Sequence, residues 1–299
     1  MWHGILPAVT TKFTETGELD FREMERCFAL QIDAGVDGLI ACGSLGEGPL
    51  LSHDERIDVF RLVQQVSDGR PALLTVAEAS TRDACRLAER GAKSGASGLM
   101  VVPSTIYNTN REETLAALRA VADASDLPIM IYSNRLAYRV DVTNDMLLEL
   151  SEDRRFVAVK ESSGDLRRTT EAVALLEGRM AVFTGVDNFA YEALMVGAVG
   201  WIAGLVVAFP AETVAIHRLI KAGRHLEALA IYRWFRPLLD LDVSEYLVQN
   251  IKRVEALVIG SNERVRAPRM PLQGAARDRV DAVVLHALKT RPVLPSISS

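Results

Sequence analysis

Short apolar runs recur along this chain, and segments whose apolar residues have helical spacing lie between them. The eight runs are residues 4–9, 37–42, 71–76, 98–102, 128–132, 156–160, 180–185 and 199–203. Alternation of this kind is typical of a parallel sheet whose strands are joined by helices through right-handed crossovers. Eight such units without an obvious point of reversal predict an α/β fold closed into a (β/α)8 TIM barrel, with an open doubly wound sheet as the alternative.

The pattern changes after Pro210, where strand signals stop and four amphipathic stretches follow, at residues 211–223, 225–241, 245–260 and 275–290. We expect the first stretch to complete the barrel and the others to form a helical extension. The chain is therefore divided into a catalytic barrel, residues 1–223, and a C-terminal helical segment, residues 224–299. A length of 299 residues agrees with this division, because α/β barrels routinely occupy about 250 residues as one unit.

The composition is that of a mildly acidic globular protein, with a formal net charge of −5 and 49% hydrophobic residues. Lys and Arg alternate with Asp and Glu along the chain, which argues against a nucleic-acid partner. The N-terminal residues lack the features of a secretory signal, so we expect the cytoplasm. Residues 193–211 are uncharged over about the length that a bilayer requires, but three glycines and Pro210 interrupt them. We interpret this stretch as a buried strand with its flanking turn and loop, and we expect no membrane partner.

Neither a metal site nor a phosphate site is predicted. The three cysteines are widely spaced, and the five histidines form no HExxH or HxH pair. The glycine-rich segment 43–48 lacks GKS or GKT and does not read GxGxxG, so it does not predict a phosphate cradle. A small organic substrate remains as the expected partner.

Functional groups in (β/α)8 barrels gather where the strands end, because loops there vary without disturbing the packed interior. Lys160 ends the sixth predicted strand, between four apolar residues and a polar loop. It is either an ordinary lysine that reaches solvent or a reactive amine partly removed from water. Tyr132 ends the fifth strand at the same mouth, where its phenol could move protons beside that amine or simply belong to the core.

The loop after the second strand contains Gly43, Gly46 and Gly48, which permit close approach of the backbone to a ligand. Successive N–H groups in such a loop could hold a carboxylate. Glu47 either orients this loop or is exposed. Weaker candidates lie near the ends of other predicted strands. They are Tyr107 after the fourth, Gly185 and Asp187 at and after the end of the seventh, and Ile202 in the apolar segment of the eighth.

Together these junctions closely resemble the dihydrodipicolinate synthase and N-acetylneuraminate lyase superfamily, the Schiff-base class I aldolases. The resemblance covers most of the chain, including the C-terminal helical segment. Its most specific motifs occur here in the order found in the family: GSLGE at 43–47, YSN at 132–134, VKESSGD at 159–165 and TGVDN at 184–188.

The resemblance implies that the amine of Lys160 attacks the 2-keto carbon of a substrate, and that the protonated imine then withdraws electrons from C3 and C4. It implies no metal and no cofactor. Tyr132 would move protons at the imine and Ser44 would relay them, while N–H groups in the segment Gly43–Leu45 would hold the substrate carboxylate. The position of Tyr107 reaches into a neighbouring subunit's site in the synthases, which predicts a homodimer or homotetramer.

Departures from the synthase pattern concern the substrate. The synthases have two adjacent hydroxyl residues after the first glycine, whereas Ser44 is followed here by Leu45. Their fifth strand continues as Tyr-Asn-x-Pro, with an arginine five residues after the tyrosine that binds the aldehyde substrate's carboxylate. The corresponding residues here are Ser133, Arg135 and Ala137.

These variant loops are most similar to a branch that deaminates 1-pyrroline-4-hydroxy-2-carboxylate in hydroxyproline catabolism. That similarity implies a lyase or hydrolase that releases ammonia and 2,5-dioxopentanoate from this cyclic imino acid. The alternatives are a 2-keto-3-deoxy sugar acid dehydratase or aldolase, 4-hydroxy-tetrahydrodipicolinate synthesis, and a non-catalytic binder of keto acids.

Overall fold

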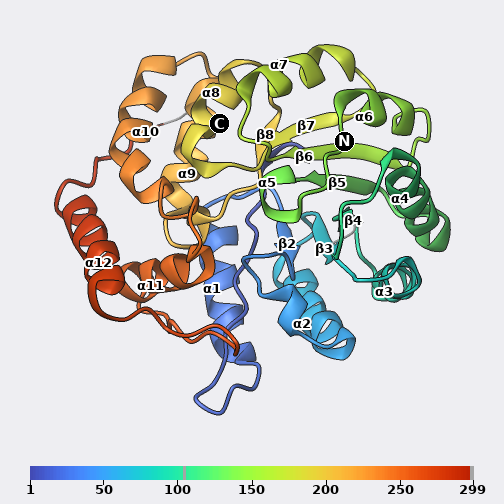
Figure 1. The fold of residues 1–299 in the computed structure, drawn as a ribbon. Helices are drawn as coiled ribbons and strands as arrows, with labels where there is room; N and C mark the ends of the chain where they lie inside the picture. Colours follow the sequence, from blue (N-terminus) through green and yellow to red (C-terminus); the bar gives the residue numbers. More distant parts are fainter. Residues whose placement is uncertain (104–105, 297–299) are drawn as a thin grey trace.

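The computed structural model describes residues 1–103 and 106–296, and its architecture confirms the predicted (β/α)8 barrel. The strands of the described residues form one parallel sheet in the order β1-β8-β7-β6-β5-β4-β3-β2 (Figure 1). Each predicted apolar run overlaps one strand, and β5 and β6 extend one residue beyond their runs. The strands are β1 (Gly4–Ile5), β2 (Leu39–Ala41), β3 (Ala72–Val76), β4 (Gly98–Val101), β5 (Ile129–Ser133), β6 (Phe156–Glu161), β7 (Ala181–Thr184) and β8 (Gly200–Trp201).

The sheet closes on itself next to its two outer strands. The N–H of Ile40 donates to the carbonyl of Pro7 at 2.9 Å, and the N–H of Val9 donates to the carbonyl of Ile40 at 3.1 Å. β1 pairs with β8 on its other side. Because the segment after β1 is hydrogen-bonded to β2, the open doubly wound alternative is excluded.

Helices cover the outside of the barrel (Figure 1). Their first turns follow ordinary capping rules: Ser52 and Glu55 form a capping box at the start of α2, and Asn110 and Glu113 form one at the start of α4. The longer helices up to the end of the barrel are α1 (Phe21–Asp33), α2 (His53–Val66), α3 (Thr81–Lys93), α4 (Arg111–Ser125), α7 (Leu166–Leu175) and α9 (Pro210–Lys221), and the shorter ones are α5 (Arg135–Tyr138), α6 (Asn144–Leu150) and α8 (Ala190–Met195).

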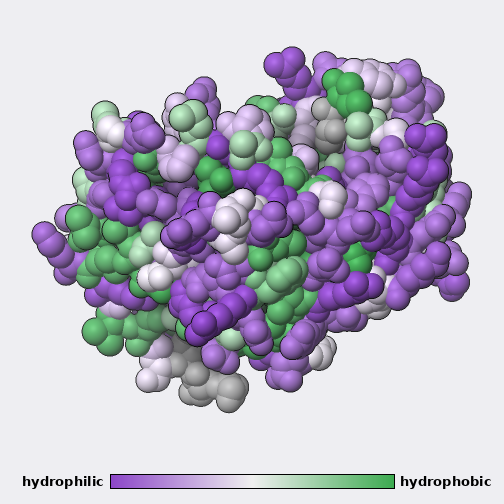
Figure 2. Space-filling view, turned by 90° about the horizontal axis from the view of Figure 1, so that it is seen from below, coloured by the Kyte–Doolittle hydropathy of each residue, from purple (hydrophilic) through white to green (hydrophobic). Residues whose placement is uncertain are grey.

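The uncharged stretch 193–211 folds as predicted. It contains the end of α8, strand β8, a short 3-10 helix at Leu205–Val207 and the start of α9. Both residues of β8 are buried, as expected for a barrel strand with helices outside it. Among the described helices, none combines the length and the apolar character needed to cross a bilayer. The face seen in Figure 2 is mostly hydrophilic, with scattered hydrophobic patches.

The C-terminal helices α10 (His225–Leu239), α11 (Leu247–Ile259) and α12 (Gly274–Lys289) gather on one side of the barrel (Figure 1). Gly223, the last residue of the predicted barrel domain, lies in the turn between α9 and α10. One hydrophobic cluster nevertheless contains buried residues from both parts, such as Phe209 and Phe235, whose rings meet edge to face at 5.4 Å.

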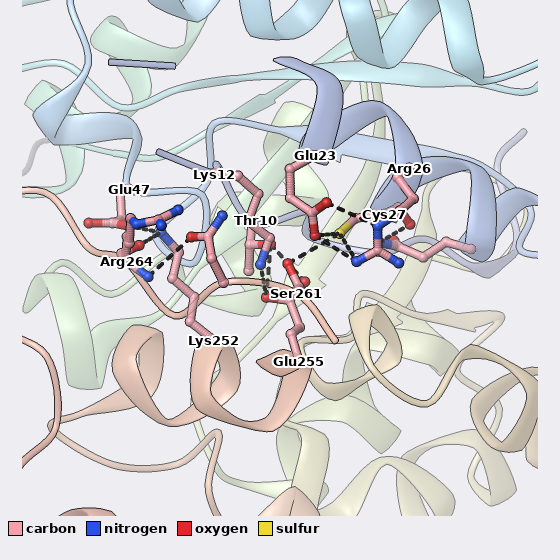
Figure 3. A network of polar contacts seen from close by, with 12 residues as sticks. Thr10, Lys12, Glu23, Arg26, Cys27, Glu47, Lys252, Glu255, Ser261 and Arg264 are labelled. Carbon is pink, nitrogen blue, oxygen red and sulfur yellow. Dashed lines mark hydrogen bonds and ion pairs between the residues drawn. The ribbon is translucent and has the colours of Figure 1, made fainter. Parts of the chain in front are cut away.

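Two buried ion pairs tie α11 to the N-terminal part of the barrel (Figure 3). Lys12 contacts Glu255 at 2.5 Å, and Thr10 donates a further hydrogen bond to the same carboxylate. Lys252 binds Glu47, and both of these side chains are fully buried. We call these four charged residues the clamp. Breaking one partner of such a pair leaves an uncompensated charge in the interior, so the clamp holds α11 firmly in place.

Candidate active site

The register between β5 and β6 makes Tyr132 and Lys160 direct neighbours at the ends of their strands. The Lys160 Nζ lies 4.0 Å from the centre of the Tyr132 ring, where the electron-rich face of the ring stabilises a cation. The Tyr132 hydroxyl accepts a hydrogen bond from the Asn134 side-chain amide at 3.1 Å. The structure therefore brings the predicted amine and the predicted phenol into contact.

Lys160 is buried, with 6% of its surface exposed, and within the described ranges it forms no ion pair. Burial lowers the pKa of its ammonium below the ordinary value, because water no longer solvates the charge. The nearby Asp242, Tyr138 and Asp187 oppose this effect. A lysine whose pKa is lowered carries more of the neutral amine, which is the nucleophile in imine formation.

A cavity of about 40 Å³ opens over the Lys160 amine. Its wall is mixed, and the polar side chains that line it are those of Ser44, Tyr132, Lys160 and Asp242. Of the predicted substrate-binding residues, Gly43, Ser44, Leu45, Gly185 and Ile202 all line it, together with Ala8, Met100, Gly204 and Leu247.

The glycine-rich loop after β2 presents its backbone to this cavity. The N–H groups of Glu47 and Gly48 donate to the carbonyls of Ser44 and Gly43, at 3.2 and 3.1 Å. Within the part of the chain that the structure describes, the N–H groups of Ser44 and Leu45 have no backbone acceptor, so both are free to hold a carboxylate.

Glu47 sets the conformation of this loop and is not exposed. It is fully buried and has a left-handed backbone conformation with a φ of 54°. Its carboxylate binds Lys252 of the clamp and accepts a hydrogen bond from the N–H of Arg266 at 3.1 Å. These contacts agree with the interpretation that Glu47 orients the loop.

Tyr138 belongs to the site although sequence reasoning did not select it. Its hydroxyl is hydrogen-bonded to the Ser44 hydroxyl, and its ring meets the Tyr132 ring edge to face at 5.7 Å. Burial raises the pKa of Tyr138 to about 12, so it stays protonated at neutral pH. It directly follows Ala137, where the sequence departs from the synthase pattern, and that departure was the signal that could have found it.

Gly185 packs directly against Lys160. A Cβ at this position would lie 2.5 Å from the Lys160 Cε and 2.1 Å from the Ser162 Oγ, closer than any real contact. The N–H of Gly185 donates to the carbonyl of Glu161 at 2.9 Å, which fixes the end of β7 beside β6. Only glycine leaves the Lys160 side chain in this position.

Two predicted site residues lie away from the cavity wall. The Asp187 carboxylate is fully buried and accepts hydrogen bonds from the Trp201 indole at 2.8 Å and from the N–H groups of Gly204 and Leu205 at 3.1 and 2.8 Å. These bonds orient the loop after β8. Tyr107 is 58% exposed and lines a separate pocket between α3 and α4.

Asp242 is a second site residue that sequence reasoning missed. It lies in the loop between α10 and α11, and its half-buried carboxyl group lines the cavity with Lys160. Burial raises the pKa of Asp242 well above its ordinary value. No local motif marks it, because the packing of the C-terminal helices against the barrel brings it to the mouth.

The arrangement has the components of imine chemistry: a buried amine, a phenol, a hydroxyl relay and backbone donors for a carboxylate. Among the residues that the structure describes, no three or more His, Cys, Asp or Glu side chains are placed to hold a metal ion. A (β/α)8 barrel with such a lysine at the end of β6 defines a Schiff-base lyase of the class I aldolase superfamily.

Comparison with known proteins agrees with this class. The model of the dihydrodipicolinate synthetase family matches residues 1–287, and the chain belongs to that family. It is 30% identical to the 4-hydroxy-tetrahydrodipicolinate synthases of Pelobacter propionicus and Moorella thermoacetica, over 95% and 98% of this chain and 98% and 99% of theirs. The structure of the same synthase from Methylacidiphilum fumariolicum SolV superposes with a TM-score of 0.91 at 27% identity, covering 97% of each chain.

Proposed function

We propose that this enzyme forms a Schiff base between Lys160 and a small 2-oxo acid or its cyclic imine. We propose 1-pyrroline-4-hydroxy-2-carboxylate as the substrate, with 2,5-dioxopentanoate and ammonia as products. Attack of the amine on C2 opens the ring and frees the ring nitrogen as an amine on C5. Loss of the C4 hydroxyl as water, followed by hydrolysis, then releases ammonia and the dioxo acid, with a net uptake of one water molecule.

Each residue of the site has a place in this proposal. The N–H groups of Ser44 and Leu45 hold the C1 carboxylate, and Lys160 bonds to C2. The phenol of Tyr132 lies beside the Lys160 amine and moves protons there. The Ser44 hydroxyl relays protons to Tyr138, its partner within the same chain.

The observation that carries the substrate proposal is the absence of a guanidinium from the cavity wall over the described residues. Ala137 stands where the resemblance places the arginine that binds the carboxylate of the synthases' aldehyde substrate. Arg135, two residues earlier, lies 3.9 Å from Asp141, away from the lining residues. A substrate with one carboxylate fits this wall better than a pair of substrates that carry two.

A second candidate is 4-hydroxy-tetrahydrodipicolinate synthesis, which the names of the two curated relatives favour. The relatives reported above include no deaminase. The lysine, the tyrosine and the carboxylate-binding loop serve both reactions, and they also serve a 2-keto-3-deoxy sugar acid dehydratase or aldolase. The difference between these activities lies in how the cavity binds the distal part of the substrate.

Direct assay separates the candidates. The purified enzyme is supplied with 1-pyrroline-4-hydroxy-2-carboxylate while ammonia is measured, then with pyruvate and aspartate semialdehyde, then with 2-keto-3-deoxy sugar acids. We expect ammonia release with kcat/KM at least about 10⁴ M⁻¹s⁻¹, in the usual enzymatic range. Condensation of pyruvate with the semialdehyde, without ammonia release from the imino acid, would establish the synthase instead. Failure of borohydride to trap any pyruvate adduct would indicate a non-catalytic binder.

We also propose that the enzyme is cytoplasmic and forms a homodimer or homotetramer in which Tyr107 reaches a neighbouring site. The exposure of Tyr107 supports an intermolecular role. Light scattering of the purified protein tests the assembly. A monomer with full activity would contradict it, because the site would then be complete within one chain.

A further inference from the structure

Asp242 lines the cavity at Lys160 from a segment outside the barrel. It comes from the loop between α10 and α11, outside the barrel strands, yet it lines the cavity that Lys160 occupies. The backbone opposite makes room for it, because a Cβ on Gly204 would lie 2.2 Å from the Asp242 Oδ1. The carboxyl group is therefore packed into the wall of the cavity.

Asp187 provides the contrast. Its oxygens are occupied by the Trp201 indole and by backbone N–H groups, so it has little capacity left for a substrate. The side-chain oxygens of Asp242 accept no hydrogen bond and form no ion pair with any residue in the described ranges 1–103 and 106–296. These oxygens are therefore open to the cavity, where a bound ligand can supply a hydrogen bond.

The rest of the site limits which part of a substrate can supply this bond. In the proposed function, the loop at Ser44 and Leu45 holds C1, and Lys160 bonds to C2. Asp242 comes from a different segment of the cavity wall, beside Gly204 and Leu247, and is left for the distal carbons. A second carboxylate there would repel Asp242 when both are charged, whereas a hydroxyl group would pair with it.

Resting on the proposed function, we propose that Asp242 is a specificity-determining residue that binds a hydroxyl group on C4 of the substrate. The substrate class is a 2-oxo acid, or its cyclic imine, with a C4 hydroxyl and no second carboxylate. Because burial raises the pKa of Asp242, its protonated form is available to donate to that oxygen.

The same contact assists loss of water. A proton leaves C3, the C3–H electron pair forms the C3–C4 double bond, and the C4–O bond breaks. The departing hydroxide takes the proton of the Asp242 carboxyl group and leaves as water, and the C3 proton restores that carboxyl group through the hydroxyl relay. Atoms and charge balance without an oxidant or a further reactant.

The test measures selectivity in imine formation, so it does not depend on deaminase activity. Wild type, Asp242→Ala and Asp240→Ala are incubated with equal concentrations of 4-hydroxy-2-oxopentanoate and 2-oxopentanoate and reduced with borohydride. The mass of the intact protein is then measured. The pyruvate adduct formed by cleavage of the hydroxylated acid is counted with that acid. Asp240 is a matched control because it lies two residues away, is half exposed and pairs with Arg236.

We expect wild type and Asp240→Ala to prefer the hydroxylated acid by about 3- to 10-fold, the range of one hydrogen bond between neutral groups. Asp242→Ala, which can neither donate nor accept a hydrogen bond, should lose most of that preference while still forming adducts with both acids. A change in the reactivity of Lys160 alone would alter both adducts equally and leave their ratio unchanged. No preference in wild type, or a preference that Asp242→Ala retains, would overturn the proposal.

Ammonia release distinguishes this outcome from failure of the proposed function. If wild type shows the preference but releases no ammonia from the hydroxylated cyclic imine, the deaminase proposal fails and the role of Asp242 stands. If wild type releases ammonia but shows no preference, the deaminase stands and the role of Asp242 fails.

Discussion

The clamp and the candidate active site both contain buried lysines, and they differ in whether the lysine contacts a carboxylate. Lys12 and Lys252 each contact a buried carboxylate in the clamp (Figure 3). Lys160 sits beside an aromatic ring and, over the described part of the chain, pairs with no carboxylate within ion-pair distance. Burial lowers the pKa of Lys252 to about 8 and also lowers that of Lys160.

From this comparison we expect that burial alone does not make a lysine reactive. A direct carboxylate partner holds the ammonium in its charged form and turns the residue into a structural contact. An amine beside a ring and a small cavity keeps its electron pair accessible to a carbonyl carbon. We therefore expect substitutions in the two regions to separate activity from stability.

The largest effect is expected at Lys160. Lys160→Ala should reduce turnover by about 10⁴-fold or more, because no other group forms the imine. Intact mass after borohydride reduction should show no adduct, and the melting temperature should stay within a few degrees of wild type. A variant that still forms the adduct would place the nucleophile elsewhere.

A smaller loss of activity is expected at the phenol. Tyr132→Phe keeps the ring under the Lys160 ammonium and removes only the hydroxyl, so the rate should fall by roughly 10² to 10⁴ if the phenol moves protons. Steady-state kinetics on the identified substrate measures this. Tyr138→Phe should be measured beside it, because this variant removes the hydroxyl that is hydrogen-bonded to Ser44 and keeps the ring. A change below threefold in Tyr132→Phe would make it a packing residue.

Substitutions in the clamp should lower stability and leave activity nearly unchanged. Glu255→Gln leaves Lys12 without its charged partner, which should lower the free energy of unfolding by about 3–5 kcal/mol. Urea unfolding measures the loss, and the activity per folded molecule should stay near that of wild type. The double variant Lys12→Met, Glu255→Leu removes both charges and should recover much of the loss. An equally unstable double variant would mean that packing, not charge, dominates here.

The smallest effect concerns pH. Because burial lowers the pKa of Lys160 below 10.5, the rate of adduct formation should rise with pH through that lowered pKa and level off above it. Asp242 raises the pKa of Lys160, so Asp242→Asn should move the rise to lower pH. Trapping rates over a pH series measure both. A midpoint at or above 10.5 in wild type would contradict the effect of burial.

The strands could be predicted because a barrel strand is buried on both faces and reads as a short apolar run. Lys160 and Tyr132 could be predicted because the strand ends of such a barrel meet at one mouth. Tyr138 and Asp242 could not be selected in this way, since they lie in the short helix α5 and in the loop between α10 and α11. The departure of the loop after β5 from the synthase pattern marks the segment that carries Tyr138. The place of Asp242 depends on how distant segments pack, which no local pattern records.

The clamp also links the glycine-rich loop to the C-terminal helices. Glu47 shapes the loop that carries Ser44, while its partner Lys252 lies on the helix that directly follows the Asp242 loop. A chimera that exchanges the C-terminal helices between relatives would therefore change two parts of the site. It would replace the loop that carries Asp242, and it would replace the helix residue that contacts Glu47 in the carboxylate-binding loop. Such exchanges have to carry position 47 along with the transplanted helices, or the two halves of the binding cavity will no longer match.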